Sequence, residues 1–371
     1  MSASGPLKGI KVLEFAALGP GPFAGTLLSD LGAEVLRIER KGVADPTPDR
    51  FDARGRRSLA LDLKRPEAVD LCLRLCERAE IVFEGNRPGV MERLGLGPDV
   101  MLARNPKLVY GRMTGWGQSG PLSAAAGHDI NYLSLTGALH SIGPKDAPVP
   151  PLNLGADYGG GAMFLLVGLL GALLHARATG EGQVVDAGMT DGASYLMTIF
   201  YGFRAAGLWK DEREANLLDG GAHFYGTYQC ADGKWISLGS IEPQFYALLL
   251  EKSGAADRLA KPQMDRESWP EMKQALREVF ATRTRDEWCA IMEGTDICFA
   301  PILSMEEAPK HPHNIARETF VEVGGVVQPA PAPRFSATPG RIQWAPAPIG
   351  HQARETLADW GIDEATIGTV A

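Results

Sequence analysis

The first 120 residues repeat one local order: a short apolar run, a turn, a helix-spaced run and a second apolar run. Residues 10–15 are mostly apolar and are followed by a Gly/Pro turn, residues 23–31 carry helix-spaced apolar side chains, and residues 33–38 are again mostly apolar. Such a strand, helix and strand form a right-handed parallel crossover. The order returns with helices at 67–79 and 90–94 and strands at 81–84 and 108–113. We therefore expect a doubly wound α/β unit.

The middle of the chain changes from long helices to a hairpin. Long apolar helices are expected at 155–175 and 191–207, with a short strand at 184–185 between them. From 227 to 238 the side chains alternate around Asp232-Gly233, a pair that favours the two-residue turn of a hairpin.

Three helical patterns and a proline-rich extended segment complete the chain. The helices are expected at 243–253, 269–281 and 285–294, and a short closing helix at 354–361. We therefore predict a large domain, a small domain and a return segment that completes the large domain, at 1–224, 225–320 and 321–371 respectively.

Composition narrows the possible partners. The chain has 37 Lys and Arg against 45 Asp and Glu, a net charge of −8, which argues against general nucleic-acid binding. The best apolar stretch, 162–174, contains two glycines and is shorter than the ~20 residues of a membrane crossing. Five cysteines without a C-x-x-C pair predict neither a disulfide framework nor a zinc site. We expect a cytoplasmic protein that binds no metal, membrane or nucleic acid.

A glycine cluster follows the first predicted strand. Residues 19–25 contain three glycines, and Glu39 ends the next strand, close to the arrangement of a dinucleotide-binding turn. A nicotinamide-dependent dehydrogenase is therefore one hypothesis. Pro20 and Pro22 oppose it, because pyrophosphate binding at such a turn needs backbone N–H groups that proline lacks. We favour the alternative, a tight turn that lets the helix pack on the sheet.

Basic residues gather after this turn, although the chain is net acidic. Guanidinium groups pair bidentately with phosphate oxygens, so a ligand with several phosphates would suit them; a solvated surface is the alternative. The residues are Arg37, Arg40, Lys41, Arg50, Arg54, Arg56, Arg57, Lys64 and Arg65.

Two further segments contain candidate acid–base residues. Asp157 is expected where a helix begins and is followed by three glycines at 159–161. It could be only a helix cap, but the glycines weaken the helix and would let an oxyanion approach exposed N–H groups beside a carboxylate. His128 lies in a glycine-bounded turn. Histidine changes charge near neutral pH, although a lone histidine can equally be structural.

Together these segments resemble the family III CoA-transferase (CaiB/BaiF) superfamily and, within it, the α-methylacyl-CoA racemases. The resemblance covers almost the whole chain, and its most specific segments are 127–132, 151–161 and 242–246. It implies a Rossmann-like large domain, a smaller α+β domain and an interlocked homodimer. The active site would lie between the large domain of one subunit and the small domain of the other.

The resemblance also implies site residues. Asp157 matches an aspartate that carries the acyl group in the transferases and moves a proton in the racemases, where His128 matches its partner. Asn153 and Glu242 match residues that steady the aspartate and the histidine, Glu242 acting across the dimer interface. Asn86 departs from the family, which usually has an aromatic residue there. The positions that match CoA contacts are Arg40, Leu61, Asp62, Leu63, Lys64, Gly85, Asn86, Arg87, Arg93, Gly127, Asp129, Ile130, Asn131 and Tyr132.

The implied reaction interconverts (R)- and (S)-2-methylacyl-CoA thioesters through an enolate and needs no cofactor, since CoA is part of the substrate. Inversion requires acid–base groups on both faces of the α-carbon, His128 and Asp157, with the glycine-rich helix start holding the enolate oxygen. CoA transfer between carboxylic acids through an aspartyl-acyl anhydride stays open, as does CoA binding without catalysis. Met163, Met189 and Met197 could line the acyl pocket or belong to the core.

Overall fold

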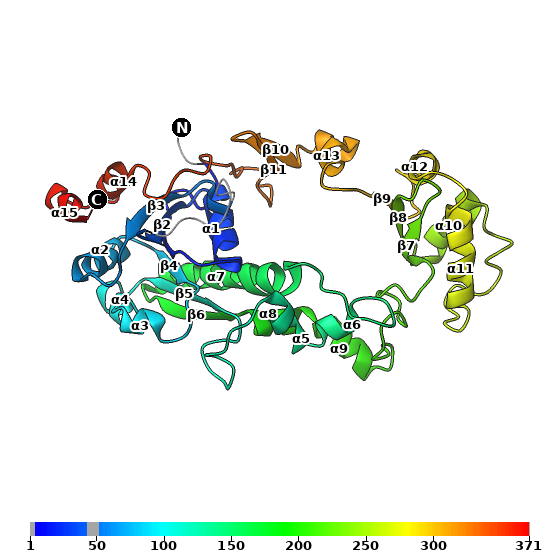
Figure 1. Ribbon diagram of the computed structural model, residues 1–371, viewed down its shortest axis with the longest axis horizontal. Helices are drawn as coiled ribbons and strands as arrows, with labels where there is room; N and C mark the ends of the chain where they lie inside the picture. Colours follow the sequence, from blue (N-terminus) through cyan, green and yellow to red (C-terminus); the bar gives the residue numbers. More distant parts are fainter. Residues whose placement is uncertain (1–3, 43–51, 371) are drawn as a thin grey trace. The chain divides into compact units, whose positions relative to one another are not determined.

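The computed structural model describes residues 4–42 and 52–370, which form two units (Figure 1). The first unit comprises Met1–Thr136, Leu152–Met197 and Glu318–Ala371, and the second comprises Gly137–Pro151 and Thr198–Arg317. The second unit therefore differs from the small domain predicted from the sequence. Two segments expected in the large domain, 137–151 and 198–224, belong to it, whereas the return segment joins the first unit.

A six-stranded parallel sheet forms the centre of the first unit. In chain order its strands are β1 (Lys11–Phe15), β2 (Glu34–Arg40), β3 (Arg57–Leu61), β4 (Ile81–Glu84), β5 (Val109–Thr114) and β6 (Gln183–Gly188). They lie in the order β3-β2-β1-β4-β5-β6, and Leu13 of β1 is level with Leu36 of β2 and Val82 of β4. The sheet is doubly wound, as predicted from the sequence, and the strand order shows that the winding reverses between β1 and β4.

Most of the four helices between β1 and β5 begin where the sequence places proline. Proline at the first helical position has a suitable φ angle and has no N–H to leave unpaired, and it occupies that position in three of the four. On the second helix, Leu71, Cys72 and Leu75 are fully buried against the sheet. The helices are α1 (Pro20–Asp30), α2 (Pro66–Cys76), α3 (Val90–Arg93) and α4 (Pro98–Arg104).

A continuous helical stretch runs from Leu154 to Thr179. Its first part, η2 (Leu154–Ala162), is π-helical, and its second part, α7 (Met163–Thr179), is α-helical and packs against β5 and β6 (Figure 1). The whole stretch is longer than the apolar segment considered from the sequence, and its length and composition would allow a membrane crossing. Half of its most apolar window is buried in the protein, as in a core helix.

The glycines of η2 allow a neighbouring helix to approach closely. This helix, α8 (Met189–Leu196), packs along η2. A β-carbon at Gly160 would lie 2.5 Å from the backbone nitrogen of Ala193, and one at Gly192 would overlap the carbonyl oxygen of Gly160. The glycine run therefore serves helix packing.

The single helix expected at 191–207 is two helices. After α8 ends at Leu196, Met197 has a ψ angle of 2°, outside the helical range, and α9 (Thr198–Ala205) begins in the second unit. The break coincides with the boundary between the units, which the apolar pattern did not indicate.

The second unit has a three-stranded antiparallel sheet, β7 (Tyr225–Gln229), β8 (Trp235–Gly239) and β9 (Phe299–Ile302), with α10 (Pro243–Ser253), α11 (Trp269–Phe280) and α12 (Arg285–Met292). The predicted hairpin is present, but its loop has three residues and not two. The N–H of Cys230 donates to the carbonyl oxygen of Lys234 at 2.8 Å, and Gly233 has a φ of +78°, as in a type I turn followed by a glycine bulge.

The return segment is less extended than its prolines suggested. It begins with a hairpin of β10 (Phe320–Val323) and β11 (Val326–Pro329) and ends with α14 (Ala353–Asp359) and α15 (Glu364–Val370). These last helices pack against β3 and α2, where Trp360 is fully buried. The remaining helices are α5 (Asp129–Ser134), α6 (Ala138–Ser141), η3 (Ala308–Lys310) and α13 (Pro312–Ala316).

Candidate active site

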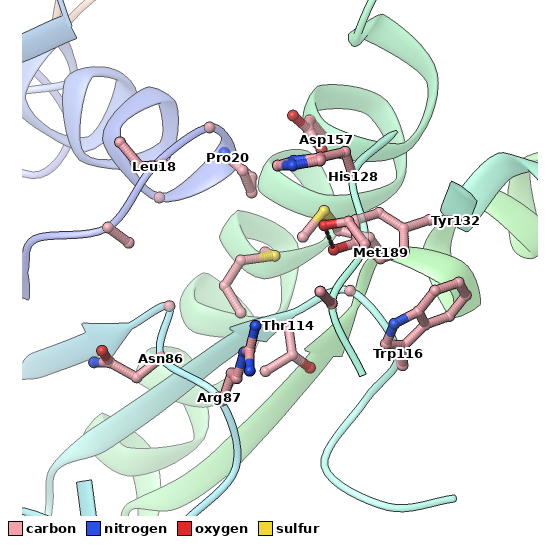
Figure 2. Close-up of a pocket in the computed structure, with 18 of the residues that line it drawn as sticks. Leu18, Pro20, Asn86, Arg87, Thr114, Trp116, His128, Tyr132, Asp157 and Met189 are labelled. Carbon is pink, nitrogen blue, oxygen red and sulfur yellow. Dashed lines mark hydrogen bonds between the residues drawn. The ribbon is translucent and has the colours of Figure 1, made fainter. Parts of the chain in front are cut away.

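A cavity of about 520 Å³ opens at the carboxyl ends of the parallel strands (Figure 2). Residues 17–21 after β1, 85–88 after β4, 113–116 at the end of β5 and Met189 after β6 line it. The loop before α5, with His128 at its end, and the side chains of Tyr132 and Asp157 complete the wall. In open parallel sheets, ligands bind at this edge where the winding reverses. The topology therefore places a ligand site here.

Asp157 lies on η2 and extends into the cavity half-buried. The amide Nδ2 of Asn153, the residue before η2, donates a hydrogen bond to its Oδ2 at 3.3 Å. Burial raises the pKa of Asp157 above its usual value. The hydrogen bond from Asn153 opposes this, the negative charge of Asp129 adds to it, and the charge of His128 lowers the pKa. A carboxyl group in this environment keeps its proton to a higher pH, so a larger fraction of it is protonated and able to act as an acid.

His128 precedes α5 and lines the same cavity. Its backbone N–H donates to Oδ1 of Asn131 at 3.0 Å, which fixes the start of the helix. The imidazole is exposed, and Figure 2 shows it at the end of the cavity where Asp157 lies. The electrostatic interaction between the two side chains is consistent with this proximity. The two predicted acid–base residues are therefore brought together.

Asp129, the residue after His128, is turned into the protein. Its side chain is buried, and its Oδ2 accepts hydrogen bonds from the N–H groups of Ala156 at 2.7 Å and Asp157 at 2.8 Å. We expected this residue to contact CoA. Its carboxylate is instead used within the protein.

Tyr132 forms part of the cavity wall below His128. Its ring is held so closely between Gly115 and Gly127 that neither position has room for a β-carbon. Its hydroxyl donates to the carbonyl oxygen of Gly127, and its ring meets Trp116 edge-on with centroids 4.8 Å apart. Burial raises the pKa of Tyr132, Asp157 adds to this and Arg87 opposes it. The packing of Tyr132 therefore requires glycine at both positions, Gly115 after β5 and Gly127 before α5.

The turn after β1 is the tight turn that we favoured. Gly19 has a φ of +67° and precedes α1, and a β-carbon there would lie 3.1 Å from Oδ2 of Asp157. Glu39, the carboxylate that a dinucleotide site would use for ribose, is buried and pairs with Arg37 at 3.2 Å. Glu39 is therefore not free to bind a ribose, which removes the acidic residue that the dehydrogenase hypothesis required.

Four of the clustered arginines pair with carboxylates of the same unit, and most of these pairs are buried. They are Arg37 with Glu39, Arg54 with Asp30, Arg56 with Glu14, and Arg57 with Glu34 and Asp359. The structure does not support the phosphate-binding alternative for these four, because carboxylates of the protein already pair with their guanidinium groups. Arg40, Lys41, Lys64 and Arg65 are exposed, and Arg50 lies outside the described residues.

The residues matched to CoA contacts fall into two groups. Gly85, Asn86, Arg87, Gly127 and Tyr132 line the cavity. The others lie outside it, and the Leu61 side chain belongs to the hydrophobic core. Contact with CoA stays a prediction for the residues of both groups, including those outside the cavity: Arg40, Leu61, Asp62, Leu63, Lys64, Arg93, Asp129, Ile130 and Asn131.

The expected enolate cradle at the glycine-rich helix start is not formed as predicted. The N–H groups of Ala156 and Asp157 donate to Asp129, and Gly160 and Gly161 are buried against α8. Close helix packing, and not access for an oxyanion, explains the glycines.

The remaining predicted residues lie elsewhere. Glu242 belongs to the second unit, where it precedes α10. Met189 lines the cavity, whereas Met163 and Met197 lie outside it. Residues 4–42 and 52–370 contain no group of three His, Cys, Asp or Glu side chains that could hold a metal ion.

Several residues that line the cavity were not predicted from the sequence, among them Leu18, Thr114 and Trp116. Their position directly after a predicted parallel strand is the signal that could have found them, since this is where the chain reaches the ligand edge. Their side chains carry no acid–base group, so residue type alone did not indicate them.

Comparison with known proteins agrees with this architecture. The family model of CoA-transferase family III matches residues 7–353. The chain is 47% identical to an α-methylacyl-CoA racemase of Mus musculus over 364 residues, 97% of this chain and 95% of that protein. It is 43% identical to the corresponding Homo sapiens protein over 368 residues, with the same two shares. A solved CaiB/BaiF family protein of Brucella suis has the same fold, with TM-score 0.83 and 23% identity over 96% of this chain and all of that one.

The doubly wound sheet, with an aspartate and a histidine at one cavity on its carboxyl edge, defines an α/β protein with the acid–base groups of an enzyme. The matched family narrows this class: the chain belongs to CoA-transferase family III. The resemblance drawn from the sequence is confirmed.

Proposed function

We propose that the protein interconverts (R)- and (S)-2-methylacyl-CoA thioesters by removing and returning the proton on the α-carbon. One observation carries the proposal: His128 and Asp157, two side chains able to exchange protons, line one cavity at the ligand edge of the sheet. The names of the two relatives that are 43% and 47% identical over nearly the whole chain support it.

The chemistry follows from the weak acidity of a proton beside a thioester carbonyl. Neutral His128 removes the proton and becomes an imidazolium, and the electrons move to the carbonyl oxygen as an enolate. Protonated Asp157 then returns a proton to the opposite face and becomes a carboxylate. The product complex thus holds His128 protonated and Asp157 ionised, which is the starting state for the reverse direction. In both directions, therefore, the active enzyme carries one exchangeable proton shared between His128 and Asp157.

The enolate needs stabilisation that the glycine run of η2 does not provide. Pro20 and Gly21, the first residues of α1, line the cavity, so the positive end of this helix dipole lies beside the developing negative charge. The imidazolium formed on His128 adds positive charge at the moment of proton removal.

The rest of the assignment is also proposed. CoA is held by Arg87 and by the exposed positions at the carboxyl ends of β2 and β3, including Arg40 and Lys64. The protein acts as a homodimer in which a second copy supplies Glu242 to steady His128. It works without a cofactor, in the cytoplasm.

The test uses a panel of (R)- and (S)-2-methylacyl-CoAs in deuterated water. We expect inversion together with one deuterium at the α-carbon. His128→Ala and Asp157→Ala should each lower the inversion rate by about 10²–10⁴-fold. His175→Ala, which removes an exposed histidine on α7, is the matched control and should leave the rate unchanged.

CoA transfer between carboxylic acids predicts a different result. It would give no deuterium at the α-carbon, and hydroxylamine would trap an acyl group on Asp157. Inversion that survives in the variant lacking both His128 and Asp157 would contradict the proposed reaction.

A further inference from the structure

Asp129 connects the segments that carry the two acid–base residues. It follows His128 directly in the chain, and its Oδ2 accepts the N–H groups of Ala156 and Asp157 at 2.7 and 2.8 Å. The side chain is only 6% exposed, so water competes little for these bonds. The start of α5 and the first turn of η2 are therefore joined at the residues that hold His128 and Asp157.

This arrangement differs from an ordinary helix cap. The residue directly before a helix normally supplies an oxygen to the first-turn N–H groups. Asn153 holds that position before η2, but it makes no such bond and donates to the Asp157 side chain. The cap comes instead from Asp129, 27 and 28 residues away in the chain. The local residue is thereby left to contact the reactive carboxyl group.

We propose that Asp129 is the positioning residue of the acid–base pair, setting the placement of Asp157 relative to His128 and favouring a proton on Asp157 through its own negative charge. The inference rests on the proposed function and extends it. An ionised carboxylate is acceptor-only, which suits two N–H donors. Its Oδ1 is buried and has no hydrogen-bond partner among the described residues, so the two N–H groups bear most of the interaction.

The electrostatic part depends on the groups that face Asp157. The charged or titratable ones are His128, Asp129 and Tyr132 from α5 and the turn before it, while Asn153 and Gly19 approach it without charge. Of the two that act on its pKa by charge, Asp129 raises it and His128 lowers it. Asp129 therefore works against the ionised form of Asp157 that ordinary solution would favour.

Two variants separate position from charge. Asp129→Asn keeps a carbonyl oxygen for the two N–H groups and removes the charge, whereas Asp129→Ala removes both. We expect Asp129→Ala to lower kcat about 100-fold with little change in KM, because a small displacement of a reacting group has this effect. Asp129→Asn should lose less, and the acid limb of its pH–rate profile should move to lower pH. In each variant kcat/KM must fall equally in both directions, since the equilibrium constant is fixed.

Asp99→Asn is the matched control, because Asp99 is an exposed acidic residue in the first turn of α4, away from the cavity. It removes the same charge and should leave kcat and the pH profile unchanged. Thermal unfolding of all variants identifies loss of structure. If Asp129→Ala unfolds and Asp129→Asn does not, the kcat and pH profile of Asp129→Asn alone decide the outcome.

Unchanged kcat and pH profile in both Asp129 variants would overturn the inference, as would a loss confined to KM or the loss of folded protein in both. Failure of the proposed function is seen separately, in the wild-type protein, as absence of deuterium at the α-carbon. If the wild type transfers acyl groups, the ratio of hydroxylamine-trapped Asp157 between variant and wild type measures the positioning role.

Discussion

Gly19 and Asp157 approach each other so closely that a β-carbon on Gly19 would lie 3.1 Å from Oδ2 of the carboxylate. The φ of +67° at Gly19 is one that other residues rarely adopt. The turn after β1 thus forms one wall of the position that the Asp157 carboxyl group occupies.

Gly19→Ala should displace Asp157 and strain the turn. We expect a loss of about 100-fold in kcat, and a loss of about 1–3 kcal/mol in the free energy of unfolding. Steady-state kinetics and urea unfolding measure the two effects. Gly171→Ala is the control, because no described heavy atom lies within 4 Å of a β-carbon there and the site is inside α7. It should keep full activity and gain about 0.5–1 kcal/mol of stability.

Asn153→Ala should raise the pKa of Asp157, because the hydrogen bond from Asn153 favours the ionised carboxylate. The acid limb of the pH–rate profile, where the pair takes up its second proton, should then move to higher pH. Asn153→Asp adds a like charge and should move it further the same way. A shift to lower pH in either variant would contradict this assignment of the hydrogen bond.

Asp157→Asn should stabilise the fold at neutral pH while abolishing inversion. The folded-state pKa of Asp157 lies above the unfolded value, so its ionisation costs stability once the pH exceeds both. Below the unfolded pKa both states are protonated and the cost disappears. Melting temperatures measured from pH 4 to pH 8 should therefore show a gain that grows with pH. A gain independent of pH would point to packing and not to ionisation.

Arg56→Ala should cost about 3 kcal/mol of stability, because the fully buried Glu14 loses the partner at 2.6 Å and keeps only Arg37, whose Nε lies 3.8 Å away. Urea unfolding measures the loss. Arg65→Ala removes an arginine from an exposed pair with Glu67 and should cost no more than about 1 kcal/mol. Equal, small losses in the two variants would contradict the assignment of Arg56 to a stabilising internal ion pair.

The order of elements was largely predictable, because apolar periodicity is a local property of the chain. The strand at 81–84 and the helix at 243–253 were predicted with the bounds that β4 and α10 have. The predicted elements were wrong where their bounds depend on tertiary contacts and not on the local sequence pattern. The break at Met197 lies inside a continuous apolar pattern, and the three-residue loop before Lys234 depends on how the strands meet.

In the candidate site, too, some features were predictable from the sequence and others depend on tertiary contacts. Residue type and family resemblance indicated His128 and Asp157, since only such side chains can exchange a proton with an α-carbon at ordinary pH. The surroundings that control Asp157 come from Gly19 and Asp129, which lie far from it in the chain. No local pattern encodes these approaches.

The sequence by itself determined the parallel α/β class and indicated His128 and Asp157 as candidate acid–base residues, because periodicity, turn residues and chemical type are read along the chain. Only the tertiary structure decided that the arginines neutralise internal carboxylates, that the η2 glycines admit α8, and that Asp129 caps the helix of Asp157. Each of these is a contact between segments distant in the chain, and its energy exists only once folding has brought them together.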